Sequence, residues 1–189
     1  MPTNFIDTEV TDFKVNAYHA GELTEVTKQD TLGKWGVYFF YPADFSFVCP
    51  TELGDLADHY AAFTNINAEI YSVSEDSEFV HKAWAEATDT IAKVKYPMLA
   101  DPAGKLARFF NVLDEDAGLA YRAVFIVDPE GKIQSYTINN MGIGRNAEEI
   151  LRTLEAAQFV AEHGDRVCPA NWHPGEDTIA PSLDLVGKL

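Results

Sequence analysis

The sequence has few cysteines, few basic residues and no long apolar run. Two cysteines among 189 residues cannot provide the dense disulfide network that holds small secreted folds together. No window is apolar over the length that a bilayer requires, so we expect no membrane span. The 14 basic residues face 30 acidic ones, and the net charge of −16 disfavours binding to nucleic acid or anionic membranes.

The N-terminus also lacks the features of a targeting signal. The stretch MPTNFIDTEVTDFKV is acidic and has neither the basic segment nor the apolar core of a secretory signal peptide. We therefore expect a cytoplasmic protein. In that reducing compartment, cysteines tend to be buried and inert, bound to a metal, or redox-active.

Apolar residues are plentiful enough for a packed core. Hydrophobic residues make up 47% of the chain and aromatic residues 12%, so the fold does not depend on disulfides. The length predicts one domain with modest extensions. Strand-like and helix-like patterns alternate, which predicts an α/β fold. We expect strands at 36–42 and 68–74, an extended piece at 96–102, and helices at 50–63, 77–87, 103–112 and 146–164.

Residues 121–138 carry the clearest hairpin pattern in the chain. Two β-rich runs flank the turn Asp128-Pro129-Glu130-Gly131, where proline and glycine occupy positions that turns favour. This hairpin is expected to add antiparallel strands to the sheet.

Cys49 stands directly before Pro50, at the start of the helix predicted at 50–63. Proline favours the first helical position, so Cys49 is predicted at the N-cap. The positive end of the helix dipole there favours the thiolate, which is the reactive form of cysteine. Glu52 opposes this effect unless a cationic group neutralises it. The alternative is a buried, inert cysteine among neighbouring phenylalanines, because free cysteines are usually buried.

Arg122 heads the first apolar run of the predicted hairpin. A buried arginine at this point needs an anionic partner, and a Cys49 thiolate with Glu52 nearby could supply one. The alternative is an arginine that extends along the strand end and keeps its charge in water.

Cys168 has a different sequence context. It follows Cys49 by 168 − 49 = 119 residues, and the absence of a C-x-x-C motif weakens a thioredoxin-type dithiol. Cys168 and His173 give only one ligand pair for zinc, so we expect no metal site. A cysteine protease would need a partner histidine, and no signature selects among the five available ones, His19, His59, His81, His163 and His173.

Several segments together resemble the peroxiredoxins. YPADFSFVCPTE is similar to their active-site motif, with Pro42, Ser46 and Cys49 in place. AYRAVFIVDPEG and GIGRNAEEILR are similar to segments that carry two arginines, here Arg122 and Arg145. RVCPANW is similar to the resolving-cysteine segment of the typical two-cysteine class. HKAW and the ending APSLDLVGKL are similar to the bacterial alkyl hydroperoxide reductase C branch of that class, and the resemblance covers essentially the whole chain.

The resemblance implies an α/β, thioredoxin-like fold with an N-terminal β-hairpin extension and a C-terminal tail. It divides the chain into a peroxidase domain at 1–164 and a tail with the resolving cysteine at 165–189. It further implies reduction of hydrogen peroxide and organic hydroperoxides through a Cys49 sulfenic acid, followed by an intersubunit disulfide with Cys168.

The same resemblance implies roles for the neighbouring residues. Arg122 would stabilise the thiolate and the reacting oxygens, Ser46 would help to hold the peroxide, and Pro42 would shield the site. Glu52 and Arg145 would support this arrangement.

No metal, haem, flavin or other cofactor is expected on this chain. The implied partner is a disulfide reductase, either the flavoprotein alkyl hydroperoxide reductase F or a thioredoxin-like protein. A homodimer that assembles into a ring, a decamer, is also implied. A different class of function stays open, a redox-regulated oligomeric chaperone or peroxide sensor.

Two features depart from the family pattern. Ser46 stands where threonine is frequent, which keeps the hydroxyl but loses the stiffening methyl group. The chain also lacks the Gly-Gly-Leu-Gly insertion and the C-terminal Tyr-Phe pair of relatives that peroxide easily inactivates. DTIAKVKYPML and DLVGKL occupy those two regions.

Overall fold

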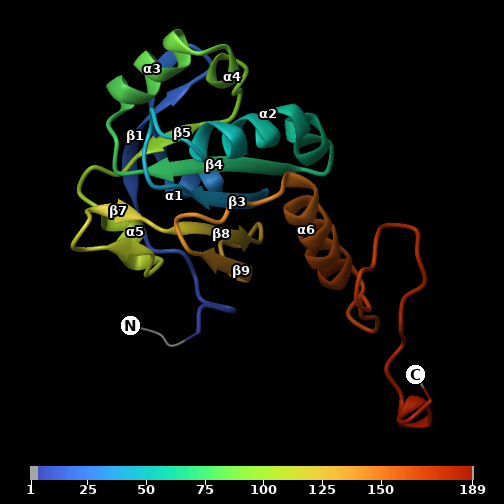
Figure 1. The fold of residues 1–189 in the computed structure, drawn as a ribbon. Helices are drawn as coiled ribbons and strands as arrows, with labels where there is room; N and C mark the ends of the chain where they lie inside the picture. Colours follow the sequence, from blue (N-terminus) through green and yellow to red (C-terminus); the bar gives the residue numbers. More distant parts are fainter. Residues whose placement is uncertain (1–3, 189) are drawn as a thin grey trace. The chain divides into compact units, whose positions relative to one another are not determined.

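The computed structural model describes residues 4–188. The chain forms two compact units, the first ending at Ala147 and the second beginning at Glu148. The first unit contains the sheet and most helices, and the second contains the last long helix and the tail (Figure 1). The functional division predicted after residue 164 stays a prediction.

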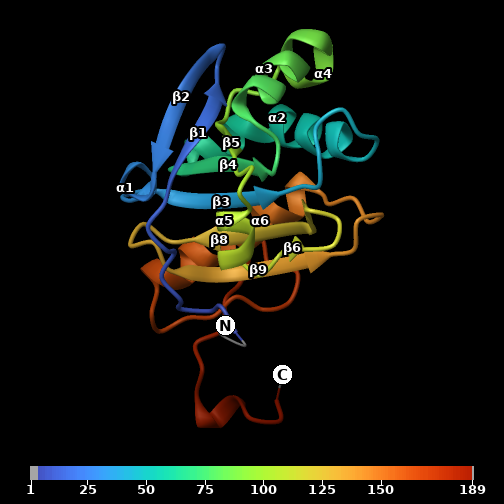
Figure 2. The ribbon, with the colours of Figure 1, turned by 90° about the vertical axis from the view of Figure 1, so that its left-hand side faces the viewer.

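Within the described residues, seven strands form one mixed sheet (Figure 2). The three central strands run parallel to one another, and the remaining pairs are antiparallel. Together with the helices, this sheet confirms the predicted α/β class. In sheet order the strands are β2 (Glu22–Thr27), β1 (Lys14–His19), β5 (Met98–Ala100), β4 (Ala68–Ser74), β3 (Trp35–Phe40), β8 (Arg122–Val127) and β9 (Ile133–Asn139).

The β1–β2 hairpin forms one edge of the sheet. Its two strands pair antiparallel, and β1 then pairs with β5. The N-terminal β-hairpin extension that the resemblance implied is therefore present. The opposite edge is formed by β9, the second strand of the hairpin predicted from residues 121–138.

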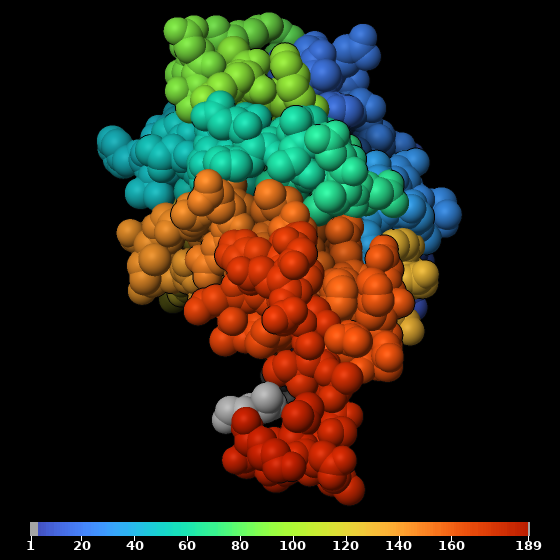
Figure 3. Space-filling view, turned by 90° about the vertical axis from the view of Figure 1, so that its right-hand side faces the viewer, coloured from blue at the N-terminus to red at the C-terminus, as the bar shows by residue number. Residues whose placement is uncertain are grey.

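One long helix, α2, lies along a face of the sheet (Figure 1). Its outer side reaches the molecular surface, where the shorter helices that follow it in the chain lie beside it (Figure 3). A second sheet pairs two short strands, β6 (Leu113–Asp114) and β7 (Leu119–Ala120). The helices are α1 (Lys28–Thr31), α2 (Cys49–Asn65), α3 (Glu78–Ala87), α4 (Asp89–Ala92), α5 (Lys105–Phe109) and α6 (Ala147–Glu162), with a 3₁₀ turn, η1, at Leu183–Leu185.

The core between the sheet and α5 is aromatic. Phe110 packs against Phe125 with ring centroids 4.5 Å apart and against Phe40 at 5.1 Å. Tyr38 and Phe125 come from neighbouring strands and point to the same face, because side chains alternate along a strand. Phe39 therefore points to the opposite face, where α2 lies and where the candidate site forms.

Element boundaries differ from the sequence prediction by a few residues. β4 spans 68–74 as predicted. β3 ends at Phe40 rather than at residue 42, because Pro42 has no N–H to donate to the sheet. α5 is shorter than the predicted 103–112, since it begins only after Gly104, whose φ of 62° is left-handed.

No helix in residues 4–188 combines the length and the apolar character needed to cross a membrane.

Candidate active site

The loop between β3 and α2 is held in a strained conformation. Phe45 has a φ of 52°, a left-handed value that an aromatic residue rarely adopts. Inside the loop, the Ser46 hydroxyl donates a hydrogen bond to the Ala43 carbonyl at 2.7 Å. Pro42 is buried beneath these residues. Strain of this kind persists only where the surrounding contacts impose it, and it is common at functional sites.

A buried polar network beside this loop imposes the conformation. Asp44 accepts hydrogen bonds from the Tyr41 hydroxyl at 2.6 Å and from His81 Nδ1 at 2.7 Å. The Asp44 N–H donates to Asp76 at 2.8 Å. His81 Nε2 lies 3.2 Å from the Leu99 carbonyl. Burial raises the pKa of Tyr41 well above its ordinary value, with a further contribution from Asp44.

Sequence reasoning named His81 only as one of five histidines and did not anticipate this network. The HKAW segment was the one available signal, and it carried no information about Asp44, which lies 37 residues away.

Cys49 is the first residue of α2, and Val48 is the N-cap. The predicted N-cap position of Cys49 was therefore wrong by one residue. The Val48 carbonyl accepts the N–H groups of Thr51 at 3.0 Å and Glu52 at 3.2 Å, which draws Cys49 into the first turn. The cysteine still lies at the positive end of the helix, and its side chain is completely buried.

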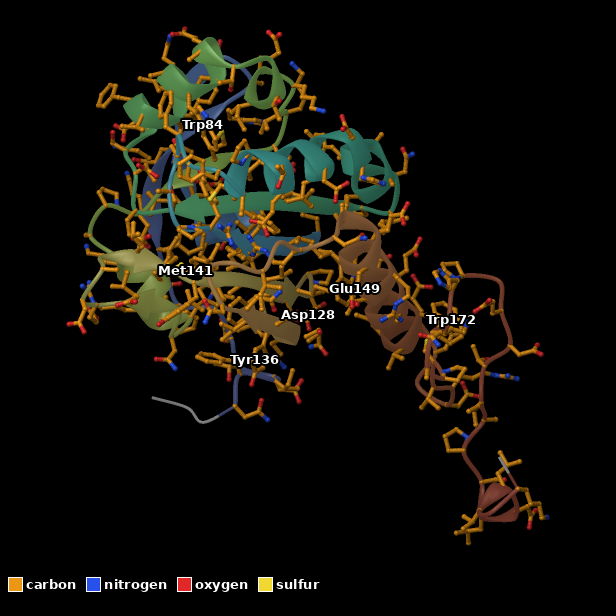
Figure 4. The ribbon with its side chains drawn as sticks, viewed as in Figure 1. Trp84, Asp128, Tyr136, Met141, Glu149 and Trp172 are labelled. Carbon is orange, nitrogen blue, oxygen red and sulfur yellow. The ribbon has the colours of Figure 1, made fainter. Side chains whose placement is uncertain are left out.

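Arg122 connects Cys49 to a buried carboxylate. Its Nη1 lies 3.4 Å from the Cys49 sulfur and 2.7 Å from Glu52 Oε2. Its Nε donates to the carbonyl of Met141, which is labelled in Figure 4. Arg122 is 4% exposed, so the alternative of an arginine with its charge in water is wrong. The expected contact with both Cys49 and Glu52 is present.

Arg145 binds the same carboxylate from another direction. Its Nε and Nη2 lie 2.8 and 3.0 Å from the two Glu52 oxygens, and its backbone N–H donates to Glu52 at 2.8 Å. Its guanidinium lies over the Phe39 ring at 3.4 Å. Burial lowers the pKa of Arg145, while the hydrogen bond and the charge of Glu52 oppose that shift.

The charges of this cluster favour an anion at Cys49. Arg122 and Arg145 carry two positive charges, and Glu52 carries one negative charge, so a neutral thiol leaves one positive charge uncompensated. Removing charges from water is costly unless they are paired. A thiolate at Cys49 completes the pairing, and Glu52 therefore positions the two guanidiniums instead of repelling the sulfur.

Cys168 has a simpler environment in the second unit. Its thiol, partly exposed, lies 3.9 Å from the Ala156 carbonyl of α6. Burial raises the pKa of the Cys168 thiol, and Arg152 opposes the shift. A bridge between Val167 and Ile179 closes the segment that follows the cysteine.

Trp172 anchors this segment to α6 (Figure 4). Its ring packs against Phe159 with centroids 5.0 Å apart, and its Nε1 donates to the Glu176 carbonyl at 3.2 Å. The fold of the tail around Cys168 therefore depends largely on one aromatic contact and a few backbone hydrogen bonds.

A metal centre finds no support in residues 4–188, where no three His, Cys, Asp or Glu side chains form a group that could hold a metal ion.

Comparisons with known proteins identify the family to which the chain belongs. The AhpC/TSA family matches residues 6–136, and the C-terminal domain of 1-Cys peroxiredoxin matches residues 156–189. Alkyl hydroperoxide reductase C of Salmonella typhimurium is 55% identical over 98% of this chain and 100% of its own length. The protein of the same name from Bacillus subtilis is 50% identical over the same shares.

Solved structures show the same similarity. The crystal structure of Enterococcus faecalis AhpC aligns with a TM-score of 0.87 and 68% identity over 88% of this chain and 100% of that one. Reduced 2-Cys peroxiredoxin of Plasmodium vivax aligns with a TM-score of 0.90 and 34% identity over 96% and 95% of the two chains. The chain thus belongs to the AhpC/TSA family and is a peroxiredoxin of the alkyl hydroperoxide reductase C type, with the thioredoxin-like fold.

Proposed function

We propose that the protein reduces hydrogen peroxide and organic hydroperoxides with Cys49 as the peroxidatic residue. The observation that carries this proposal is Arg122, which joins the Cys49 sulfur at 3.4 Å to Glu52 at 2.7 Å inside a buried cluster. An inert buried cysteine has no need of two guanidiniums, whereas a nucleophilic thiolate does.

The chemical step is a two-electron oxidation of sulfur. The Cys49 thiolate attacks one peroxide oxygen, the O–O bond breaks, and the departing oxygen takes a proton to leave as water or an alcohol. The sulfur becomes a sulfenic acid. Arg122 stabilises both the thiolate and the negative charge that moves to the departing oxygen, because its N–H groups are already oriented before the reaction.

Ser46 and Pro42 complete the peroxide site. The Ser46 hydroxyl donates to Ala43, which leaves its lone pairs free to accept the O–H of the incoming peroxide. Buried Pro42 limits the access of water to the thiolate. Glu52 accepts a hydrogen bond from Arg122 and is itself held by Arg145, so the two residues keep Arg122 in place.

Cys168 of a partner subunit would then resolve the sulfenic acid. Its thiol displaces the sulfenic oxygen as water and forms a disulfide with Cys49. Because bridged cysteines need Cα atoms within about 7 Å, the first turn of α2 must unwind and the tail must leave its contacts with α6.

A disulfide reductase returns both cysteines to thiols. The flavoprotein alkyl hydroperoxide reductase F or a thioredoxin-like protein has the required chemistry. The proposal includes a homodimer that assembles further into a decamer ring, and a cytoplasmic location.

A non-reducing gel before and after one equivalent of peroxide tests the disulfide step directly. We expect reduced monomers to become covalent dimers, and intact mass to show loss of two hydrogens per disulfide. A disulfide within a single chain, or no disulfide at all, would contradict the intersubunit mechanism.

A further inference from the structure

Two acidic residues that directly follow β4 form hydrogen bonds to two segments of the candidate site. Asp76 accepts the backbone N–H of Asp44, in the loop that leads to Cys49, at 2.8 Å. The neighbouring residue, Glu75, accepts the N–H of Ala120 at 2.8 Å. Ala120 belongs to β7 and precedes Arg122 by two residues. Two adjacent carboxylates thus connect the loop at 42–48 to the segment that leads into β8, the strand that begins with Arg122.

Glu75 accepts the Ala120 N–H through one carboxylate oxygen, Oε2. Its second oxygen, Oε1, is buried and has no hydrogen-bond partner within residues 4–188. The charged groups that act on it are Asp76 in the same segment, Asp101 after β5, and Arg108 on α5.

Arg108 is engaged elsewhere, and Asp101, itself an acid, cannot neutralise Glu75. Asp101 accepts the N–H groups of Lys105 and Ala107 at the start of α5. Arg108 directs its guanidinium to Glu115 at 2.7 Å and to the Ala103 carbonyl at 2.6 Å. An ionised Glu75 would therefore be a partly buried anion that faces two other carboxylates.

Burial raises the pKa of Glu75 to about 7, the Ala120 hydrogen bond opposes the shift, and repulsion from Asp101 and Asp76 adds to it. Burial raises the pKa of Asp101 as well. The neutral and ionised forms of Glu75 are both populated near neutral pH, which is unusual for a glutamate.

We propose that Glu75 is a proton-dependent positioning residue that orders the peroxide site when neutral and loosens it when ionised. The neutral carboxyl keeps a carbonyl oxygen for the Ala120 N–H and leaves no buried charge. When the proton passes to solvent, the anion can gain hydration only if the surrounding segment opens. That opening involves β7 on one side and, through Asp76, the loop at 42–48 on the other.

Hydrogen exchange of the reduced wild-type protein tests the structural part of this proposal without reference to catalysis. Peptides that cover residues 113–121 and 42–48 are followed at about pH 6 and about pH 8, with rates corrected for intrinsic exchange. We expect opening of both segments to rise about tenfold across this interval, since each pKa unit corresponds to a factor of ten.

Two variants make the test specific. Glu75→Gln keeps a carbonyl acceptor for Ala120 but cannot ionise, so its corrected exchange should not change with pH. Glu130→Gln removes an exposed carboxylate in the β8–β9 turn and should behave as wild type. The proposal fails if wild-type exchange is equal at both pH values, or if Glu75→Gln keeps the wild-type pH dependence. If Glu75→Gln does not fold, the wild-type comparison still decides.

The catalytic consequence rests on the proposed peroxidase function. Peroxide reduction by wild type should slow relative to Glu75→Gln as pH rises through about 7. If the wild-type protein reduced no peroxide but its exchange still depended on pH, the proposed function would be wrong and the role of Glu75 would stand. Normal peroxidase activity with flat exchange would contradict only the role of Glu75.

Discussion

Each of the two cysteines lies in a Val-Cys-Pro tripeptide, yet the surroundings of the two tripeptides have little in common. Cys49 is fully buried at the start of α2, where Arg122 lies 3.4 Å from its sulfur. Cys168 is partly exposed, and its thiol lies 3.9 Å from the Ala156 carbonyl. A guanidinium lies beside the sulfur at the first site, whereas burial raises the pKa of the thiol at the second.

This difference arises from residues that are remote in the chain. Arg122 and Arg145 lie 70 and 93 residues after Glu52, and only folding brings them to the first Val-Cys-Pro. The second one has Arg152 as a charged neighbour. In the proposed mechanism, the buried, charged site at Cys49 suits attack on peroxide, and the partly exposed Cys168 thiol suits disulfide formation.

The largest expected effect is the difference in peroxide reduction between variants of the two cysteines. Cys49→Ser should abolish peroxide reduction, because no nucleophile remains in the arginine cluster. Cys168→Ser should still reduce about one equivalent of peroxide per subunit but should form no disulfide. Single-turnover peroxide consumption, with mass spectrometry of both cysteine peptides, measures this. Equal activity of Cys49→Ser and wild type in the presence of the reductase would show that the assignment is wrong.

Removal of Arg122 should make the first site behave more like the second. We expect Arg122→Ala to slow peroxide reduction about a hundred- to thousandfold, the range found when one preorganised donor is removed. Stopped-flow rates, together with thiolate absorbance against pH, provide the measurement.

Lys14→Ala is the control for Arg122→Ala, because Lys14 forms an exposed ion pair with Glu25 at the edge of the sheet. Its peroxide rate should stay close to that of wild type, since exposed ion pairs contribute little. A wild-type rate in Arg122→Ala would place the function of Arg122 outside catalysis.

The loosely held tail leads to a prediction about inactivation. Because the chain lacks both the Gly-Gly-Leu-Gly insertion and the C-terminal Tyr-Phe pair, the first turn of α2 should open at a cost of about 1–2 kcal/mol, so that Cys168 reacts before a second peroxide arrives. We expect turnover to continue at peroxide levels that inactivate sensitive relatives. Titration of peroxide during turnover, with mass spectrometry of the Cys49 peptide, tests this. Early accumulation of sulfinic Cys49 would show that the missing motifs do not control opening.

The smallest expected effect concerns the Cys168 thiol alone. Because burial raises its pKa, alkylation of Cys168 at neutral pH should be several-fold slower than in urea-unfolded protein, and the rate should rise as the solution becomes alkaline. Trp172→Ala removes the ring that packs on Phe159 and should bring the rate close to the unfolded value. Peptide mass spectrometry after timed alkylation gives the rates. An unchanged rate in Trp172→Ala would mean that other contacts protect the thiol.

The sequence alone predicted much of the local structure. Alternation and β-branched residues located β4 at 68–74, and the turn at 128–131 located the hairpin of β8 and β9. The family motifs singled out Cys49, Arg122 and Arg145. These signals lie in short stretches of the chain, so they can be read without knowledge of which strands meet.

Tertiary structure decided which of these groups act together. The binding of both guanidiniums to Glu52, the Asp44–His81 pair and the bond between Glu75 and Ala120 all join residues at least 37 apart in the chain. Such contacts depend on the order and register of the strands, and that order is set by packing of the whole core rather than by any local pattern. Charge balance in a buried site depends on the complete set of neighbours. For this reason the sequence could name Cys49, Glu52 and the two arginines, but not the contacts by which both guanidiniums bind one carboxylate.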